Sequence, residues 1–459
     1  MTWLSASEAV TRLLTAILGI FIARKLGAEN FGVFTFATSL TGMFAVLADF
    51  GLRSIVVREL NQKEEARSEL GTVLWLRIIL GIVTFFLIFI FSFFIENDIA
   101  KIITIIFGAV ILVSNIHTFY ISVFQATQKM EYISITEILK TLFIVTGGFL
   151  ILFMKPNIIL IAYLYLSASV LSSIVSFFIA RRLSFGSLLN FDKKIAKKYL
   201  TMSLPLVLSS AFSAIYVQTD SVMMGFWNMI KEVGWYQAAY RVVNITVVPA
   251  IVIGIVFYPI IANAYKKKEN FQKIVDLFFL LLVSVALPIA VGGFLLAKDI
   301  IIFLYSDEYL PSVLAFKMLT LTSSFIMLSL FINYLLITTG RQKDFSFITG
   351  LTALLNVFLN LVLIPRYSLY GAAGATLISY TLLLLLGFFY LDRINVLPNF
   401  KIISLPLLAA LTMAAFLSWK FSYDISIIPR ILIGGFIYCF VFLIILILKD
   451  KLSPVKITI

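Results

Sequence analysis

Hydrophobic segments long enough to cross a lipid bilayer follow one another along almost the whole chain, with short connections between them. A membrane-spanning helix needs about 20 consecutive, mostly apolar residues, and about fourteen stretches meet that requirement. These stretches lie near residues 3–23, 33–51, 71–94, 101–124, 133–154, 158–180, 201–227, 236–262, 274–297, 312–337, 345–365, 371–391, 402–419 and 430–448. We therefore expect an all-α polytopic membrane protein whose function is carried out inside the membrane.

The composition agrees with this interpretation and narrows the possible chemistry. Hydrophobic residues make up 61% of the chain and charged residues 13%, whereas about 25% of the residues in an ordinary globular protein are charged. Cys439 is the only cysteine and His117 the only histidine. Because metal sites are commonly built from several such side chains, we expect no metal site and no cofactor, and we expect His117 to serve packing or a hydrogen bond.

The net charge of +13 is explained by its distribution along the chain. Most Lys and Arg residues fall in the connections after the even-numbered spans and at the C-terminus, whereas fewer follow the odd-numbered spans, Arg430 among them. Cytoplasmic loops of membrane proteins carry such an excess of positive charge. We therefore expect a multi-pass protein of the cytoplasmic membrane with both termini in the cytoplasm, and we do not expect nucleic acid as a partner.

Two short patterns recur six spans apart. Residues 26–34 (LGAENFGVF) precede the second span, and residues 231–236 (KEVGWY) precede the eighth. Residues 126–132 (ATQKMEY) at the fifth span likewise resemble residues 340–346 (GRQKDFS) at the eleventh. An even number of spans keeps both copies in the same orientation, so we expect two lobes related by an axis along the membrane normal.

This repeat predicts the organisation of the whole chain. We expect an N-terminal six-helix lobe over residues 1–182, a cytoplasmic linker over 183–200, a C-terminal six-helix lobe over 201–393, and two extra helices with a cytoplasmic tail over 394–459. Parallel repeats of this kind occur in transporters, where the substrate site lies between the lobes and opens alternately to either side. The sequence thus favours a transporter.

Further segments are spread over nearly the whole chain: 23–32 (ARKLGAENFG), 47–52 (LADFGL), 57–59 (VRE), 219–220 (TD), 240–241 (YR), 304–309 (LYSDEY), 360–365 (NLVLIP) and 370–375 (YGAAGA). In these segments the chain resembles the oligosaccharide flippases of polysaccharide biosynthesis. They share a superfamily with multidrug and toxin extruders and with peptidoglycan lipid flippases. The resemblance identifies the superfamily well and the substrate poorly, because none of the segments is a chemical signature.

The resemblance implies a flippase that moves a polyprenyl-(pyro)phosphate-linked oligosaccharide from the cytoplasmic to the outer leaflet by alternating access, for cell-surface polysaccharide biosynthesis. Its partners would be this lipid-linked substrate, membrane lipids and a coupling ion, H⁺ or Na⁺. An ion-coupled exporter of drugs or organic cations is the alternative, and it would favour carboxylates over arginines in its lumen. A glycan polymerase or ligase would carry a long outward loop, whereas the longest connections here are predicted to be cytoplasmic, so we do not expect an enzyme.

Arginines and glutamates in or near the predicted spans are candidates for a function or a pairing, because inserting an ionisable group into the bilayer costs roughly 2.5–3.5 kcal/mol. Glu8 and Arg12 stand four residues apart, either as an ion pair on one helix face or with Arg12 turned toward an anionic head group. Arg24, Arg53 and Arg58 lie at helix ends or in connections, where topology explains them. The flippase resemblance also runs through these positions, and arginine binds phosphate well, so all four arginines are substrate-lumen candidates.

Two neighbouring spans carry polar stripes, each on one helix face. Their members are Ser209, Ser213, Tyr216 and Asp220 in span seven, and Gln237, Arg241 and Asn244 in span eight. We expect Asp220 and Arg241 either to line a cavity, in which they can pair, or to form a structural bridge. Gln237, Arg241 and Asn244 are further lumen candidates.

The remaining charged residues concern ion coupling and the membrane surface. Glu137 and Lys140 stand three residues apart in span five, where they can neutralise each other. A carboxylate beside a lumen is also the group that would couple transport to H⁺ or Na⁺, so Glu8, Glu137 and Asp220 are the ion-coupling candidates. Arg77, early in span three, is expected at the membrane interface.

Overall fold

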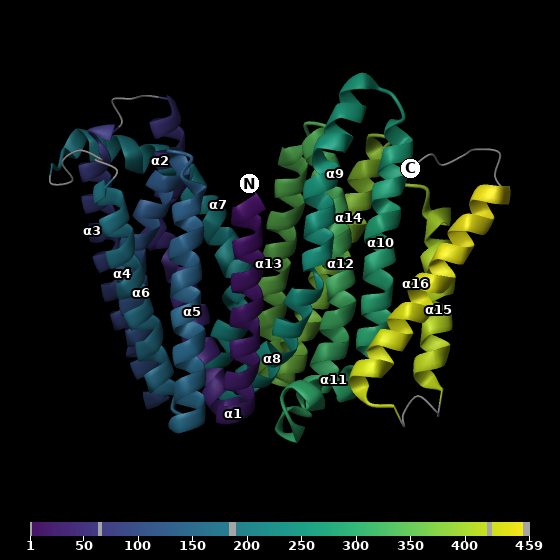
Figure 1. Ribbon diagram of the computed structural model, residues 1–459, viewed down its shortest axis with the longest axis horizontal. Coiled ribbons are helices and arrows are strands. Elements are labelled where there is room, and N and C mark those ends of the chain that lie inside the picture. Colours follow the sequence, from purple (N-terminus) through teal and green to yellow (C-terminus); the bar gives the residue numbers. More distant parts are fainter. Residues whose placement is uncertain (1, 63–66, 183–189, 420–424, 453–459) are drawn as a thin grey trace. The chain divides into compact units, whose positions relative to one another are not determined.

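The computed structural model describes residues 2–62, 67–182, 190–419 and 425–452, and the side chains of residues 2–9, 208, 209, 213 and 449–452 lie outside the description. Regular structure within these ranges is helical (Figure 1). The chain divides into two compact units, Met1–Gln237 and Ala238–Ile459. The predicted lobe boundaries at residues 182 and 393 stay predictions.

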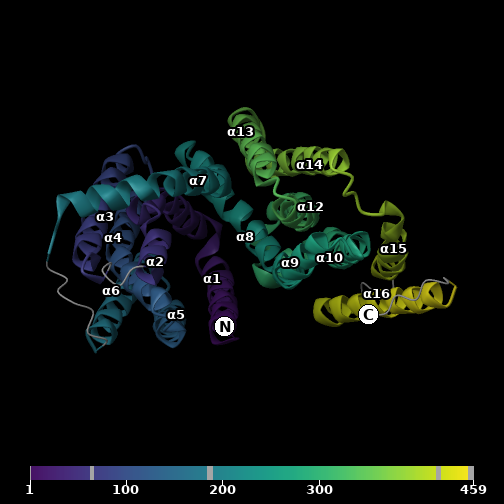
Figure 2. The ribbon, with the colours of Figure 1, turned by 90° about the horizontal axis from the view of Figure 1, so that it is seen from above.

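The first unit is a bundle of long helices, seen along their axes in Figure 2. Its helices are α1 (Thr2–Asp49), α2 (Leu52–Gln62), α3 (Leu70–Ser92), α4 (Asp98–Ala126), α5 (Met130–Met154), α6 (Ile158–Arg182), α7 (Lys193–Phe226) and the beginning of α8 (Ile230–Thr246). α4 packs against α1, α3 and α6, and α7 packs against α1. Asn97 caps α4 by accepting a hydrogen bond from the Ala100 amide at 2.9 Å, and this satisfies an amide that the helix itself leaves unpaired.

The first two predicted spans are the two arms of α1. The arms are separated by a break at Gly27, whose φ of 81° and ψ of 171° are not helical. A backbone with this φ is readily adopted only by glycine. Residues 3–23 and 33–51 lie on either side of this break, as predicted, but no loop separates them.

The second unit contains the remaining helices. They are the rest of α8, α9 (Val248–Lys267), α10 (Phe271–Leu295), α11 (Ala297–Leu304), α12 (Ser312–Thr338), α13 (Gln342–Tyr367), α14 (Leu369–Arg393), α15 (Ser404–Ser418) and α16 (Ile427–Leu452), with short 3₁₀ turns at Asp307–Tyr309 and Phe400–Ile403. Phe331 on α12 packs against Phe278 and Phe279 on α10, with ring centroids 5.6 and 5.1 Å apart. α15 and α16 pack on each other, and Tyr438 on α16 donates to the Ser284 carbonyl oxygen on α10 at 2.8 Å.

The segments 126–132 and 340–346, predicted to correspond, contain closely similar turns. The Thr127 amide donates to Val123 O at 3.0 Å and the Thr339 amide to Leu335 O at 3.0 Å. Gln128 and Gly340 then take positive φ angles of 58° and 75°. Both turns have the hydrogen bonds of a Schellman helix ending. Thr127 thus matches Thr339, two residues from the alignment predicted from the sequence.

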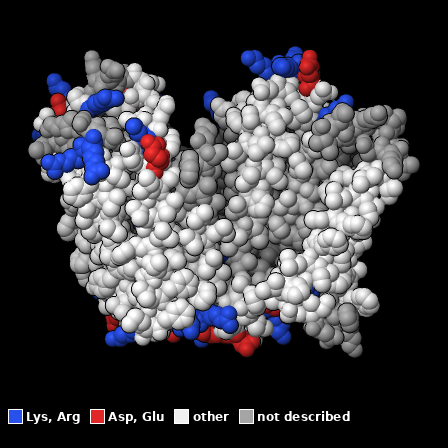
Figure 3. All heavy atoms as spheres, in the orientation of Figure 1, with Lys and Arg blue, Asp and Glu red and all other residues white. Residues whose placement is uncertain are grey.

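Twelve helices among the described residues are long and apolar enough to span a membrane, or thirteen if the bent pair Lys193–Val207 and Ser210–Phe226 is one span. Thirteen is one fewer than the predicted fourteen because both arms of α1 fall in one counted span, Val10–Gln62. Twelve is one fewer again because the bent pair, which corresponds to the predicted span 201–227, is then left out. On the face shown in Figure 3, charged side chains gather at the helix ends and leave a largely uncharged band between them. The chain is therefore an all-helical, multi-pass membrane protein.

Candidate functional site

Three helices of the first unit contribute to a hydrogen-bonded chain of polar side chains. His117 on α4 is buried, with 2% of its surface exposed. Its Nδ1 lies 2.9 Å from the Ser176 hydroxyl on α6, and its Nε2 lies 3.2 Å from Oε1 of Glu137 on α5. The Glu137 side chain stays 42% exposed. The carboxylate therefore connects a buried imidazole with the accessible surface, and it pairs with His117, whereas Lys140 acts on it from a longer distance.

Arg53 lies near this chain, on the first turn of α2. Its guanidinium donates from Nε and Nη2 to Oε1 of Gln125 on α4, at 3.4 and 3.3 Å. The charge of Arg53 also acts on Glu137. Arg53 is exposed, and its Nη1 makes no hydrogen bond with any residue that the structure describes. The region thus offers donors for an anion beside a carboxylate that can take a proton.

Arg58, one helical turn further along α2, belongs to a different set of charges. It donates to Oε1 of Glu59 at 3.3 Å, and Glu59 is 4% exposed. Lys198 on α7 lies 3.8 Å from the Glu59 carboxylate and 2.9 Å from that of Glu69. Lys198 thereby connects α7 to α2 and to the start of α3, so the charges around Arg58 tie the ends of three helices together.

The predicted position of Arg77 at the membrane interface stays a prediction, but its guanidinium is bound within the protein. Arg77 is completely buried, and its Nη2 donates to Oδ1 of Asp49 at 2.9 Å while its Nη1 donates to Oδ1 of Asn115 at 2.9 Å. Asn115 in turn donates to the carbonyl oxygens of Ala48 and Arg77, at 2.9 and 2.6 Å. The cluster fixes the end of α1 to α3 and α4. Asp49 was missed as a candidate, although it stands in the segment 47–52 that carries the family resemblance.

One member of each polar stripe predicted on spans seven and eight bonds a residue of the other helix that lies beside the other stripe. The Tyr236 hydroxyl donates to Oδ2 of Asp220 at 2.5 Å, and Nε2 of Gln237 donates to the Ser221 hydroxyl at 2.5 Å. Asp220 is 6% exposed. The side chains of Ser209 and Ser213 lie outside the described residues. Asp220 is therefore held by a phenol of α8.

Arg241 belongs to the second unit, near two buried tyrosines of the turn after α11. Tyr305 donates to the Ala238 carbonyl oxygen at 3.0 Å, and its ring centroid lies 5.1 Å from that of Tyr309. Burial raises the pKa of both phenols, and the positive charge of Arg241 opposes that rise. The charge of Arg241 thus lies close enough to act on both phenols of this turn. Its predicted pairing with Asp220 stays a prediction, because the two residues belong to different units.

The other candidates lie on accessible positions or outside the described side chains. Arg12 and Arg24 are exposed on the first arm of α1, and Asn244 is exposed on α8. The side chain of Glu8 lies outside the description, so its predicted pairing with Arg12 stays a prediction. Within the described ranges, no group of three or more His, Cys, Asp or Glu side chains is arranged to hold a metal ion.

The protein is similar to known proteins over nearly all of its length. The family model "Polysaccharide biosynthesis protein" matches residues 1–265, and the model "MatE" matches residues 205–362. The "Probable low-salt glycan biosynthesis flippase" of Haloferax volcanii is 23% identical over 82% of this chain and 79% of its own. The "Capsular polysaccharide biosynthesis protein" of Staphylococcus aureus is 24% identical over 84% of this chain and 98% of its own.

Two solved structures share the fold. The lipid II flippase MurJ in an inward closed conformation has a TM-score of 0.82 at 20% identity, over 98% of this chain and 99% of that one. An inward-facing multidrug resistance MATE family transporter has a TM-score of 0.65 at 14% identity, over 84% of this chain and 94% of that one. Because the first family model covers more than half of the sequence, the chain belongs to the polysaccharide biosynthesis protein family, a family of membrane transporters and not of enzymes.

Proposed function

We propose that this protein is a flippase that moves a polyprenyl-(pyro)phosphate-linked oligosaccharide from the cytoplasmic to the outer leaflet, for cell-surface polysaccharide biosynthesis. Membership of the polysaccharide biosynthesis protein family supports a role in glycan transport. Relatives named for glycan biosynthesis and for capsular polysaccharide biosynthesis support the same proposal. The observation within the molecule that supports it best is Arg53, an exposed guanidinium at the start of α2 with a donor that no described residue uses.

Arg53 is suited to the charged part of such a substrate. A guanidinium forms two parallel hydrogen bonds to phosphate oxygens, and Gln125 holds that of Arg53 through its Nε and Nη2. Arg12 and Arg24, exposed on α1, are further phosphate-binding candidates. Gln237, Arg241 and Asn244 are the corresponding candidates on α8, and Arg58 serves mainly the charges around Glu59.

We further propose the finer features of a member of this family. The chain would have about fourteen spans, arranged as two six-helix lobes over residues 1–182 and 201–393 with two extra helices, and with both termini in the cytoplasm. The substrate would move by alternating access of these lobes. H⁺ or Na⁺ coupling would use Glu137 or Asp220, with Glu8 as a third candidate.

An ion-coupled exporter of drugs or organic cations is the second candidate function. The match of the MatE model to residues 205–362 favours it, as do the partly exposed carboxylates of Asp49 and Glu137. The two functions differ in substrate charge, because arginines bind an anionic head group and carboxylates bind a cation. An experiment that offers both substrates therefore separates them.

The test is transport by the purified protein in sealed vesicles that contain a labelled polyprenyl-pyrophosphoryl oligosaccharide. An impermeant glycan-cleaving enzyme on one side reports the fraction of head groups that reach that side. We expect movement that depends on the protein and falls at least tenfold in Arg53→Gln, as for the loss of a charge-assisted contact of about 1.5–3 kcal/mol.

Arg341→Gln is the matched control, because Arg341 pairs with Asp344 at 3.2 Å on an exposed connection. This variant should transport as the unmodified protein does. Movement equal to that in protein-free vesicles, together with organic-cation efflux under an ion gradient, would reject the flippase in favour of the exporter. Unchanged transport in Arg53→Gln would reject the role of Arg53.

A further inference from the structure

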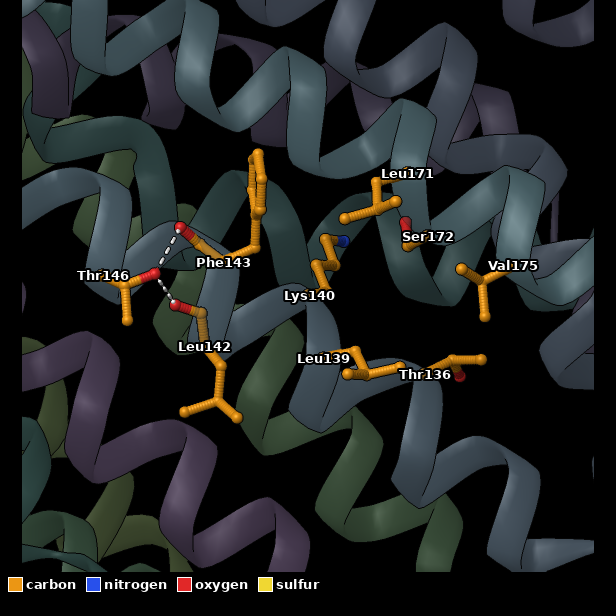
Figure 4. A pocket seen from close by; sticks show the side chains of 9 residues that line it. All are labelled: Thr136, Leu139, Lys140, Leu142, Phe143, Thr146, Leu171, Ser172 and Val175. Atoms are coloured by element: carbon orange, nitrogen blue, oxygen red, sulfur yellow. Dashed lines mark hydrogen bonds between the residues drawn. The ribbon is translucent and has the colours of Figure 1, made fainter.

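A crevice between α5 and α6 lies on the first unit, outside the proposed substrate-binding residues. Its volume is about 310 Å³, and the ammonium group of Lys140 points across it toward α6 (Figure 4). Leu142 and Phe143 on α5 and Leu171 on α6 form apolar walls, and these three side chains are 44, 38 and 38% exposed. On two helices that span a membrane, exposed apolar walls of this kind contact lipid chains.

The hydroxyl groups in the crevice are already used by their own helices. Thr146 donates to the Leu142 carbonyl oxygen at 2.7 Å and to that of Phe143 at 3.4 Å (Figure 4). Thr136 donates to Tyr132 O at 2.9 Å, and Ser172 donates to Ser169 O at 3.0 Å. The donors of these three hydroxyls are therefore occupied, and only their acceptor lone pairs remain for a ligand.

Lys140 is the charged residue of this wall, and the protein gives it no close counterion. Among the residues that the structure describes, none forms a hydrogen bond or an ion pair with its ammonium group. The nearest candidate on its own helix, Glu137, is paired with His117 instead. A lysine in a transmembrane helix is costly unless its charge meets water or an anion.

The Lys140 side chain is long enough to carry its charge back toward the start of α5 and so toward an anionic head group. Lys140 stands ten residues after Met130, the first residue of α5, so its backbone lies about 15 Å along the helix. Side chains on a helix point toward its N-terminal end, and a lysine stem reaches back toward the polar boundary. The ammonium group can thus lie nearer the start of α5 than the Lys140 backbone does, while Leu142 and Phe143 continue further along the helix.

We propose that this crevice binds one anionic glycerophospholipid, with its phosphate on Lys140 and an acyl chain along Leu142, Phe143 and Leu171. The positive charge selects a lipid with net negative charge, and the apolar walls accept its chain. The largely apolar lining favours an acyl chain over a glycan as the occupant. The lipid would be a bound component of the transporter, whether or not the proposed substrate is correct.

The experiment is native mass spectrometry of the purified full chain, delipidated in detergent and titrated with phosphatidylglycerol or phosphatidylcholine of equal chain length. One lysine near an anionic lipid surface contributes about 1 kcal/mol, which corresponds to about fivefold in affinity. We expect the first phosphatidylglycerol to bind about fivefold more weakly to Lys140→Gln, and Lys140→Arg to bind it as the unmodified protein does. Phosphatidylcholine binding should be the same in all three proteins.

Lys317→Gln is the matched control, since Lys317 is also a lysine on a transmembrane helix, and its ammonium already lies over the Phe294 ring at 4.9 Å from the centroid. This change should leave the first phosphatidylglycerol in place. Equal binding of phosphatidylglycerol to Lys140→Gln and the unmodified protein would overturn the proposal. Lys140-dependent displacement of phosphatidylglycerol by equimolar polyprenyl phosphate would also overturn it, because the occupant would then be the carrier lipid.

Discussion

Gly32 on α1 and Gly234 on α8 face each other in a reciprocal contact between two backbones. A Cβ atom added to Gly32 would strike the Ile230 carbonyl oxygen and lie 3.1 Å from the Gly234 amide nitrogen. A Cβ atom added to Gly234 would strike the Ala28 carbonyl oxygen and lie 3.1 Å from the Gly32 amide nitrogen. The two glycines stand in the two copies of the repeated pattern, 26–34 and 231–236, so each copy packs on the other.

This contact predicts that Gly32→Ala and Gly234→Ala each destabilise the protein. The new methyl group would meet backbone atoms, which cannot turn away as a flexible side chain can, and such overpacking costs about 1–3 kcal/mol. Thermal unfolding in detergent, followed by circular dichroism, measures the change. Gly350→Ala is the control, because nothing lies within 4 Å of a Cβ atom there. If Gly32→Ala unfolded at the same temperature as Gly350→Ala, the tight contact would be refuted.

The buried Arg77 cluster predicts that Asp49→Asn weakens the first unit. The guanidinium would lose its counterion while staying completely buried, and a hydrogen bond to a charged group contributes about 1.5–3 kcal/mol. The Asp49 side chain is 38% exposed, so solvent screening places the expected loss near the lower end of that range. Denaturant unfolding measures it.

Asp344→Asn is the matched comparison for Asp49→Asn. Its carboxylate pairs with the exposed Arg341 at 3.2 Å, and exposed ion pairs contribute about 0–1 kcal/mol. The two variants should therefore differ clearly in their denaturation midpoints. Equal midpoints would mean that the Asp49–Arg77 pair adds no more than a surface pair does.

The positions of the spans could be predicted because each needs its own run of apolar residues, and that requirement is local. Between the first two spans, Arg24, Lys25, Glu29 and Asn30 interrupt the apolar run and so predict a connection there. That the chain stays helical through these residues, with its non-helical φ/ψ at Gly27, could not be predicted from them. The partners of buried charged side chains could not be predicted from the sequence either, because they come from other helices. Arg77 meets Asp49 and Asn115 from two other helices, and Glu137 meets His117 instead of Lys140 on its own helix.

Arg430 illustrates the same limit in the second unit. Its charge beside an apolar run predicts a place in the connection before the last span, because charged residues commonly mark the ends of spans. The structure places it within α16, where it is 4% exposed and its Nη2 donates to Oδ2 of Asp299 on α11. A charged residue at the end of an apolar run gives the same sequence pattern whether its side chain is exposed to water or paired with a counterion on another helix.

The Asp299–Arg430 pair predicts a local effect of Arg430→Met. The variant would leave Asp299, which is 39% exposed, free to be hydrated, while α16 would lose its contact with α11. We expect backbone amides at the start of α16 to exchange hydrogen about tenfold faster, equivalent to about 1.4 kcal/mol of local stability. Arg393→Met, which removes a guanidinium 4.4 Å from the Phe389 ring centroid, should leave these amides unchanged. Unaltered exchange in Arg430→Met would show that the pair does not hold α16.

The His117–Glu137 pair gives the sharpest test of the proposed ion coupling. Glu137→Gln keeps a carbonyl oxygen that can accept from the imidazole, so the fold should persist, but the side chain can no longer take up a proton. A gradient of one pH unit supplies about 1.36 kcal/mol per proton. In vesicles with such a gradient, we expect the distribution of substrate to shift by up to about tenfold with the unmodified protein and to stay unchanged with Glu137→Gln. Glu131→Gln, at an exposed position on the first turn of α5, should retain the full shift. Loss of the shift in Asp220→Asn but not in Glu137→Gln would instead place coupling at the Asp220–Tyr236 hydrogen bond.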